Sequence, residues 1–269
     1  MEKIKIDQNE LAVFDIGATH LRMGSIQNNA VANQIVVDTP QNFEDALNII
    51  SKYIVDNNKK IIVAGIAGPM NREKTTLLDS NLTSWIGINI KDQIQNKTNA
   101  KVLLENDTAL VGLAEAVYGE GINHSIVAYV TVSTGVNGVR IEDKKISKNW
   151  AGFEIGEQLI DGNISLEEKV GGLALEKKYN KLPTDIDDPT VWHQLELDLA
   201  RGLSNTILHW SPEILIVGGG LSPKINIDNL NHEIEKLIGS FFSVPKITKG
   251  NLGEFGGLMG AHAFAMQNN

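Results

Sequence analysis

Residues 101–115, KVLLENDTALVGLAE, contain an abrupt change of local structure. The apolar run 102–104 is typical of a buried strand; it stops at Glu105, Asn106 and Asp107, and the Ala- and Leu-rich pattern of a helix begins at once. A side-chain oxygen of Asp107 would cap this helix. Alternatively, the polar groups would line the ligand site that open α/β sheets form at their strand ends. Capping needs one such residue and does not explain three in a row, so the rest of the chain must decide between the two interpretations.

The composition excludes several classes of protein. The chain has 269 residues, of which 42% are hydrophobic and 21% charged, as in globular proteins. Its net charge of −9 argues against a nucleic-acid partner, which needs clustered cations. Because there is no cysteine, disulfides, thiol catalysis and Cys-based zinc sites are excluded. No signal peptide and no bilayer-length apolar stretch is found, so we expect a cytoplasmic protein without a membrane partner.

Strand-like and helix-like runs alternate along the chain, which predicts mixed α/β layers. The predicted strands are 11–14, 21–26, 61–65, 101–104, 126–132, 138–141 and 214–217. The predicted helices are 42–55, 107–118, 166–179, 191–210, 228–238 and 256–266. The stretch 180–189, NKLPTDIDDP, is rich in turn formers, and we expect it to be an exposed connection.

Two segments of the chain share one plan. VFDIGATHLRMGSI (13–26) and YVTVSTGVNGVRIE (129–142) each read as a β-run, a turn of Gly, Thr and small residues, and a second β-run. This echo predicts a similar hairpin in each half of the chain. It is typical of a duplicated α/β unit with a cleft between the halves.

The first hairpin has the residues of an anion site. Asp15 follows an apolar strand, Gly17 permits a tight turn whose N–H groups face an anion, and Thr19 adds a hydroxyl. Asp15 would then organise a hydrated Mg²⁺. The alternative is an ordinary hairpin with a turn glycine. The Walker loop GxxxxGK[ST] is absent from the chain.

Two further strand ends are rich in glycine or hydroxyl groups. In the second hairpin, Thr134 and Gly135 supply a hydroxyl and a flexible backbone after a buried strand. In ILIVGGGLS, three glycines (Gly218, Gly219 and Gly220) follow a strand and allow a bulky ligand to approach the backbone. The alternatives are a second plain hairpin and a loop that needs positive φ angles.

Acidic residues recur near the ends of predicted elements: Glu105, Asp107, Glu154, Glu157, Asp161, Glu167 and Glu168. Carboxylates accept hydrogen bonds from sugar hydroxyls, and one of them would take the proton of an attacking hydroxyl. Most acidic residues in a protein of this charge are solvated surface. The six histidines show no metal-ligand spacing such as HExxH.

Taken in chain order, eight segments resemble the motifs of the ROK family (repressors, open reading frames and sugar kinases). They are DIGATHLRMG, GIAGPM, NLTSW, ENDTALVGLAE, VSTGVNGV, FEIGEQ, SLEEKVGG and ILIVGGGLS. The resemblance runs from Asp15 to the C-terminal GGLMGAHAFA. It implies an actin-like ATPase (ribonuclease H-like) fold of two α/β lobes with a central cleft, and a homodimer. The small lobe would hold 1–108 and 255–269, and the large lobe 109–254.

The resemblance also implies an ATP-dependent sugar kinase that transfers the γ-phosphate to a hexose hydroxyl, with Asp107 as the general base. The sugar would be bound by Gly68, Asn81, Asn106, Asp107, Glu154, Glu157 and Glu167. The first phosphate element would be Asp15, Gly17 and Thr19, with Asp15 holding Mg²⁺ through water. Thr134 and Gly135 would form the second, and Gly218–Gly220 the nucleotide-side loop. Such transfer depends mostly on positioning and on Mg²⁺.

Departures from the family pattern bear on the substrate. Glu157 stands where many members have a His that binds zinc together with a Cys-rich loop, and this chain lacks both, so we expect no zinc site. That His also touches the sugar, so glucose, N-acetylmannosamine, N-acetylglucosamine and fructose stay open. Phe153 stands where Gly is usual and would narrow the pocket.

Two other functions stay open. A catalytically silent sugar-binding protein is compatible with Glu157 and Phe153, although Asp107 and both phosphate elements are retained. A sugar-responsive repressor would carry a helix-turn-helix ahead of Asp15. Only about 14 residues precede Asp15, too few for a three-helix module of the kind that reads DNA.

Overall fold

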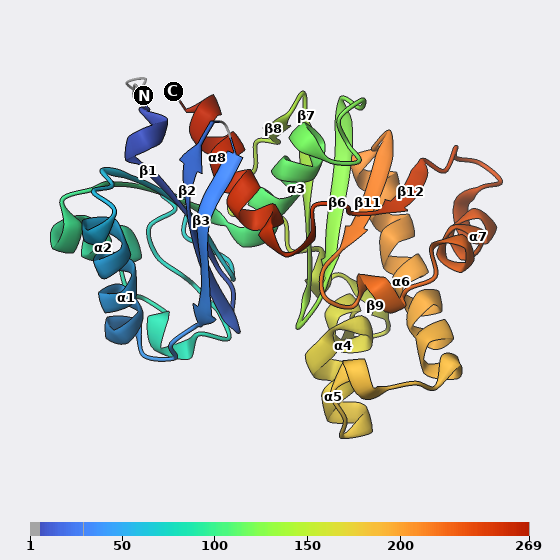
Figure 1. Cartoon of the computed structure of the whole chain (residues 1–269). Coiled ribbons are helices and arrows are strands. Elements are labelled where there is room, and N and C mark those ends of the chain that lie inside the picture. The colour runs from blue at the N-terminus through green and yellow to red at the C-terminus, as the bar shows by residue number, and fades with distance from the viewer. Residues whose placement is uncertain (1–5, 29, 269) are drawn as a thin grey trace. The chain divides into compact units, whose positions relative to one another are not determined.

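The computed structural model describes residues 6–28 and 30–268 and shows two units, each built on a five-stranded mixed sheet (Figure 1). By its contacts, unit 1 takes the described residues up to Ala114, the segment Lys148–Gly152, and the chain from Leu252 onward. Unit 2 takes Glu115–Ser147 and Phe153–Asn251. The predicted mixed α/β class is confirmed. The lobe limits expected at 108/109 and 254/255 remain predictions.

The sheet of unit 1 has the strand order β3-β2-β1-β4-β5. Its strands are β1 (Leu11–Ile16), β2 (His20–Gln27), β3 (Ala30–Asp38), β4 (Ile61–Ile66) and β5 (Lys101–Asn106). The first three strands are antiparallel, whereas β4 and β5 run parallel to β1. The carboxyl ends of β1, β4 and β5 therefore meet at one edge, where Asp15 is in register with Gly65, and Gly65 with Glu105.

Helices cover both faces of this sheet. They are α1 (Phe43–Asp56), α2 (Ile90–Thr98), α3 (Asp107–Tyr118) and α8 (Gly256–Gln267). Figure 1 shows α1 and α2 on one side of β1–β3 and α8 on the other. Phe14 and Ile16 join the buried cluster of α1 and α2, whereas Leu11 and Val13 pack with residues of α3 and α8. Because side chains alternate along a strand, Asp15 continues the row of Leu11 and Val13 toward α3 and α8.

The sheet of unit 2 has the order β12-β11-β6-β7-β8. Its strands are β6 (Ile126–Val132), β7 (Val136–Glu142), β8 (Lys145–Ile146), β11 (Ile214–Gly218) and β12 (Lys246–Lys249). Read from β8, this is the strand order of unit 1, with three antiparallel strands followed by two that run parallel to β6. The two predicted hairpins, and their common plan, are confirmed.

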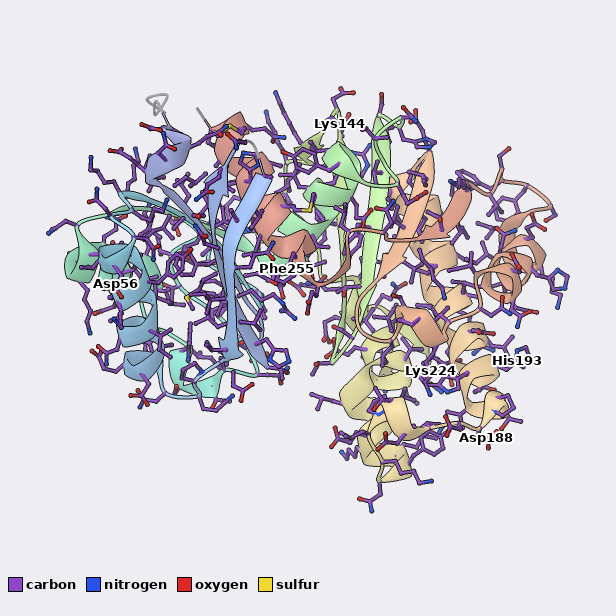
Figure 2. The ribbon with its side chains drawn as sticks, in the orientation of Figure 1. Asp56, Lys144, Asp188, His193, Lys224 and Phe255 are labelled. Carbon is purple, nitrogen blue, oxygen red and sulfur yellow. The ribbon has the colours of Figure 1, made fainter. Side chains whose placement is uncertain are left out.

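Four helices and a small ribbon complete unit 2. They are α4 (Leu166–Val170), α5 (Gly172–Tyr179), α6 (Pro189–Trp210), α7 (Ile227–Ile238), β9 (Leu159–Asp161) and β10 (Ile164–Ser165). One buried cluster joins the sheet to α4, α6 and α7, with Val130, Leu199 and Ile234 among its members. Beyond the end of α3, the Lys144 ammonium donates to the carbonyl oxygens of Gly121 (2.9 Å), Ile122 (2.7 Å) and His124 (2.9 Å) (Figure 2).

One expectation about the elements is corrected by the structure, and several elements were missed. The helix predicted over 166–179 is broken at Gly171, which is extended (φ −68°, ψ 147°). There the N–H of Gly172 donates to Ser133 O (2.7 Å), at the turn of the second hairpin. The elements β3, α2 and β12 were not predicted: β3 is a largely exposed edge strand, and α2 buries only Ile90 and Ile94. Within the described ranges, no helix has the length and apolarity to span a membrane.

Candidate active site

The junction of β5 and α3 holds three polar residues with different partners. Asn106 caps α3, because its Oδ1 accepts the N–H of Ala109 (3.0 Å), and its Nδ2 donates to Gly68 O (3.3 Å). Glu105 pairs with the Lys74 ammonium (2.7 Å). The cap considered for Asp107 is thus provided by Asn106. The Asp107 carboxylate accepts the N–H of the next residue, Thr108 (2.6 Å).

Asp15 and Asp107 form a pair of interacting carboxyl groups. Asp15, at the end of β1, is buried, and this burial together with the charge of Asp107 raises its pKa to about 7. Arg22 lies opposite Asp15 in the hairpin, with Nη1 3.4 Å from Oδ2, and opposes this pKa shift without cancelling it. Burial also raises the pKa of Asp107, against hydrogen bonds from Thr108. Two carboxyl groups therefore lie in one poorly solvated environment, with the Arg22 guanidinium as a nearby cation.

Two glycines make room for this pair. A Cβ on Gly257, in the first turn of α8, would lie 2.5 Å from Cγ of Asp15. A Cβ on Gly65, in β4, would lie 3.1 Å from the Asp107 Cα. Any larger residue at Gly257 would push α8 away from the Asp15 carboxylate. The close approach of α8 thus depends on the absence of a side chain.

The turn of the first hairpin is tied to the chain after β3. Gly17 N donates to His20 O (3.0 Å) across the turn, and Thr39 N donates to Thr19 O (2.9 Å). The Thr39 hydroxyl donates to Gly17 O (2.7 Å). Gly17 and Thr19 therefore sit in a fixed turn directly after Asp15.

The loop after β4 carries the remaining residues of unit 1 that were predicted to bind sugar. Gly68 has φ +120°, and a Cβ there would meet Asp79 O at 2.3 Å, so only glycine fits. The hydroxyl of Ser80 donates to Ala67 O (2.9 Å), and the next residue, Asn81, is exposed. The structure thus brings Gly68 to Asn106. It leaves the Asn81 side chain at the surface of the same loop.

In unit 2, Glu167 holds the turn of the second hairpin. Its Oε2 accepts the N–H of Val136 (2.7 Å), and a Cβ on Gly135 would lie 2.4 Å from that oxygen. At the start of α5, Leu173 N donates to Thr134 O (3.0 Å). Thr134, Gly135 and Glu167 therefore lie together at this turn. One oxygen of Glu167 is already engaged by the backbone.

Glu154 directly precedes the short helix Ile155–Glu157, Glu157 is its last residue, and both are exposed. The Glu154 Oε2 accepts a hydrogen bond from the Asn137 side chain (3.2 Å), which places it beside β7. The Phe153 ring packs edge-on against Trp210, with 5.0 Å between the ring centroids. The expected narrowing of a sugar pocket by Phe153 stays a prediction.

The glycine loop lies beside the end of β6. Gly219 has φ +87°, and a Cβ there would meet Val132 O at 2.4 Å. A Cβ on Gly218 would lie 2.2 Å from the Tyr129 hydroxyl, whereas Gly220 has open space around it. The loop and the turn that carries Thr134 therefore both lie at the carboxyl end of β6.

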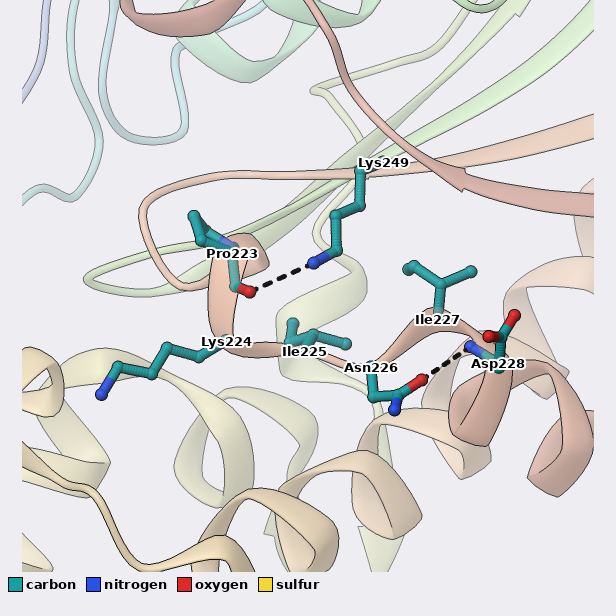
Figure 3. Close-up of a pocket in the computed structure, with 7 residues that line it drawn as sticks. All are labelled: Pro223, Lys224, Ile225, Asn226, Ile227, Asp228 and Lys249. Atoms are coloured by element: carbon teal, nitrogen blue, oxygen red, sulfur yellow. Dashed lines mark hydrogen bonds between the residues drawn. The ribbon is translucent and has the colours of Figure 1, made fainter.

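A hollow of about 430 Å³ opens directly after this loop (Figure 3). It is lined by Pro223, Lys224, Ile225, Asn226, Ile227, Asp228 and Lys249. The ammonium group of Lys249 donates to Pro223 O (3.1 Å), and Asn226 caps α7. Sequence reasoning missed these residues, since no motif marks them.

Three residues that touch the predicted site were also missed. They are Arg22 beside Asp15, Lys74 beside Glu105, and Gly257 against Asp15. The partnership of Asp15 and Arg22 was present in the sequence, because a short hairpin places these residues opposite each other. The other two contacts join segments far apart along the chain.

Known proteins resemble this chain over most of its length. Residues 11–268 match the model of the ROK family. The glucokinase of Thermotoga maritima is 24% identical, over 94% of this chain and 96% of its own. The xylose repressor of Bacillus subtilis is 30% identical, over 65% of this chain and 52% of its own.

One solved structure is the ROK family glucokinase from Streptomyces griseus in complex with glucose and AMPPNP. It matches with a TM-score of 0.78, covers 96% of this chain and 99% of that one, and is 21% identical. This similarity shows the actin-like ATPase fold that the motifs implied.

Proposed function

Because the chain belongs to the ROK family, we propose that it is a sugar kinase that transfers the γ-phosphate of ATP to a hexose hydroxyl, with Asp107 as the general base. The observation that carries the proposal is the pair of Asp107 and Asp15. Asp107 stands at a strand end where Asn106 already caps the helix, and burial raises its pKa. A carboxylate with a raised pKa is a better proton acceptor near neutral pH.

The sugar is proposed to bind through groups next to these carboxylates. In unit 1, Asn106 and the backbone at Gly68 are held together by a hydrogen bond (3.3 Å), and Asn81 lies on the same loop. In unit 2, the carboxylates of Glu154, Glu157 and Glu167 would accept hydrogen bonds from sugar hydroxyls. The Oε1 oxygen of Glu167 would accept a hydrogen bond from a sugar hydroxyl, while Oε2 holds the hairpin turn through the N–H of Val136.

The donor is proposed to bind through the glycine- and hydroxyl-rich turns: Gly17 and Thr19 in unit 1, and Thr134, Gly135 and Gly218–Gly220 in unit 2. The hollow beside Lys249 supports this assignment, since its volume of about 430 Å³ is in the range of small-molecule sites. Gly218 and Gly219 cannot carry side chains without clashes. Gly220, by contrast, has open space around it, so the phosphate is proposed to approach the loop at this residue.

A hydrated Mg²⁺ fits beside Asp15, since Arg22 leaves part of the negative charge of the Asp15–Asp107 pair uncompensated. When bound, the ion neutralises charge on the transferring phosphate. Asp15 would hold it through water and Asp107 would keep its role toward the sugar. Independence from zinc, a cytoplasmic location and a homodimer remain predictions.

Coupled ADP release with Mg-ATP tests the proposal across glucose, N-acetylglucosamine, N-acetylmannosamine and fructose. We expect turnover on at least one sugar and a loss of about 10²–10⁴-fold in Asp107→Asn. Asp45→Asn is the matched control, because Asp45 is an exposed acid in the first turn of α1, which Asn42 caps as Asn106 caps α3. Wild-type rates in Asp107→Asn would refute the assignment of the base.

A second candidate function is a sugar-responsive regulator or a silent sugar-binding protein. The 30% identity to a xylose repressor favours it. It predicts sugar binding in calorimetry with no ADP release for any sugar of the panel. A shift of DNA mobility by the protein would support the regulator in particular.

A further inference from the structure

Trp150 is the most exposed of the large apolar side chains that the structure describes, at 72%. Of the other tryptophans, Trp85 and Trp192 are buried and Trp210 is half-buried. The Arg72 guanidinium lies over the Trp150 ring, 4.2 Å from its centroid. An indole with one face stacked and 72% of its surface exposed has its other face open to solvent. A single exposed apolar side chain is ordinary in itself; what distinguishes Trp150 is the guanidinium that holds one face of its ring.

This stack is fastened to the β5–α3 junction. Arg72 belongs to the turn 71–76, in which the Asn71 side chain accepts from the N–H groups of Thr75 (2.8 Å) and Thr76 (3.1 Å). The same turn carries Lys74, whose ammonium lies 2.7 Å from Glu105 Oε1. Glu105 directly precedes Asn106 and Asp107. Two side-chain contacts within one rigid turn thus link the exposed indole to the proposed sugar-binding junction, all within unit 1.

The polar groups of Arg72 are also available. In the ranges 6–28 and 30–268, its guanidinium takes part in no hydrogen bond or ion pair, and it stacks on the indole. A guanidinium stacked on a ring keeps its five N–H donors in one plane. The pair therefore offers an apolar plane and a fixed row of donors side by side.

We propose that Trp150 and Arg72 form an outer carbohydrate subsite, so that the preferred acceptor is a disaccharide or another glycoside rather than a free hexose. A pyranose ring has an apolar C–H face, which would stack on the open side of the indole, and a rim of hydroxyls, which would accept from Arg72. The inference rests on the proposed function, because the first ring must be held at Asn106 and Asp107. Little ordering is needed, since the indole is already held by Arg72.

The size of the effect follows from the stacking contribution. Contacts with an aromatic ring add a modest amount to the affinity beyond the burial of area. The extra ring should therefore tighten binding about 2- to 12-fold. Removal of the indole should abolish this gain and leave the affinity for the single sugar as it was.

The test is calorimetry on the whole chain with matched sugars: glucose with maltose and cellobiose, N-acetylglucosamine with chitobiose, and fructose with sucrose. We expect one disaccharide to bind more tightly than its single sugar. We expect Trp150→Ala to lose that difference and Trp150→Phe to keep part of it. The control is Phe241→Ala, since Phe241 is an aromatic residue of unit 2 with similar exposure (68%).

Tryptophan fluorescence gives a second readout that does not depend on activity. Binding of the favoured disaccharide should shift the emission to the blue and protect it from acrylamide, and Trp150→Ala should remove both changes. If single sugars bind and no disaccharide gains, or if Trp150→Ala keeps the gain, the subsite is refuted and the kinase proposal stands. If no sugar of either kind binds, the proposed function falls with it.

Discussion

The two sheets have the same strand order but end in different chemistry. In unit 1, the ends of β1, β4 and β5 carry Asp15, Gly65 and the run Glu105–Asp107. In unit 2, the corresponding strands β6, β11 and β12 end in Val132, Gly218 and Lys249. The two sheets thus present the ends of corresponding strands in the same order, and the residues at these ends differ in charge and size.

The hairpins show this difference at its clearest. In the first hairpin, the penultimate residue of β1, Asp15, faces Arg22, and in the second, the penultimate residue of β6, Thr131, faces Asn137. A charged pair in one unit stands where a neutral pair stands in the other. The proposed function accordingly assigns proton and cation chemistry to unit 1 and phosphate binding to the turns and glycine loop of unit 2.

The largest expected difference between the units is in the pH dependence of stability. Folding raises the pKa of Asp15 from 3.8 to about 7, so the folded state binds a proton that the unfolded state has lost between about pH 4 and pH 7. The stability that this proton provides is complete below pH 4 and lost as the pH rises to 7. We expect this loss to be roughly 4 kcal/mol relative to Asp15→Asn.

Urea unfolding of the wild type and Asp15→Asn across this pH range measures the effect. Thr131→Val changes the same position in the second hairpin. The difference between its free energy of unfolding and that of the wild type should not change with pH. Added Mg²⁺ should stabilise the wild type near pH 7.5 and leave Asp15→Asn unaffected. If the free energies of unfolding of the wild type and Asp15→Asn change with pH in the same way, the two hairpins do not differ in the manner described.

A smaller effect is expected at the glycines. A Cβ on Gly257 would lie 2.5 Å from the Asp15 Cγ, whereas nothing lies within 4 Å of a Cβ on Gly220. Gly257→Ala should therefore cost about 1–3 kcal/mol despite the better helix propensity of Ala. Gly220→Ala should change the free energy of unfolding by about 0.5 kcal/mol or less. Thermal unfolding compares the two, and equal costs would contradict the crowding around Asp15.

The ion pair of Lys74 with Glu105 at the β5–α3 junction should make a measurable contribution to stability. Lys74 and Glu105 are 23% and 11% exposed, so Lys74→Met would leave a poorly solvated charge. We expect a cost of about 1–2 kcal/mol. The control is Lys52→Met, since the pair of Lys52 with Asp56 is exposed and should contribute about 0.5 kcal/mol or less. If urea unfolding gives the same cost for both variants, the Lys74 turn is not a fixed part of the junction.

Much of this arrangement was predictable from local pattern. Both hairpins and the start of α3 at Asp107 follow from strong periodicity and from punctuation by glycine. The division into α4 and α5 was not, because the N–H of Gly172 is captured by Ser133 from a distant turn. In the site, Asn106 donates to Gly68 O and directly precedes Asp107, and the sugar-binding roles of the three remain predictions. The contacts of Lys74 and Gly257 depend on tertiary packing that no local window contains.

The division of roles between the units is tested most directly by the kinetics of two variants, Asp107→Asn and Gly219→Ala, on the sugar that the wild type phosphorylates. Asp107→Asn should lower kcat by about 10²–10⁴-fold with the KM for ATP unchanged. Gly219→Ala, where a Cβ meets Val132 O at 2.4 Å, should raise the KM for ATP while the pH dependence of kcat is kept. If Asp107→Asn keeps its kcat, or if both variants raise only the KM for ATP, the assignment of proton chemistry to unit 1 is contradicted.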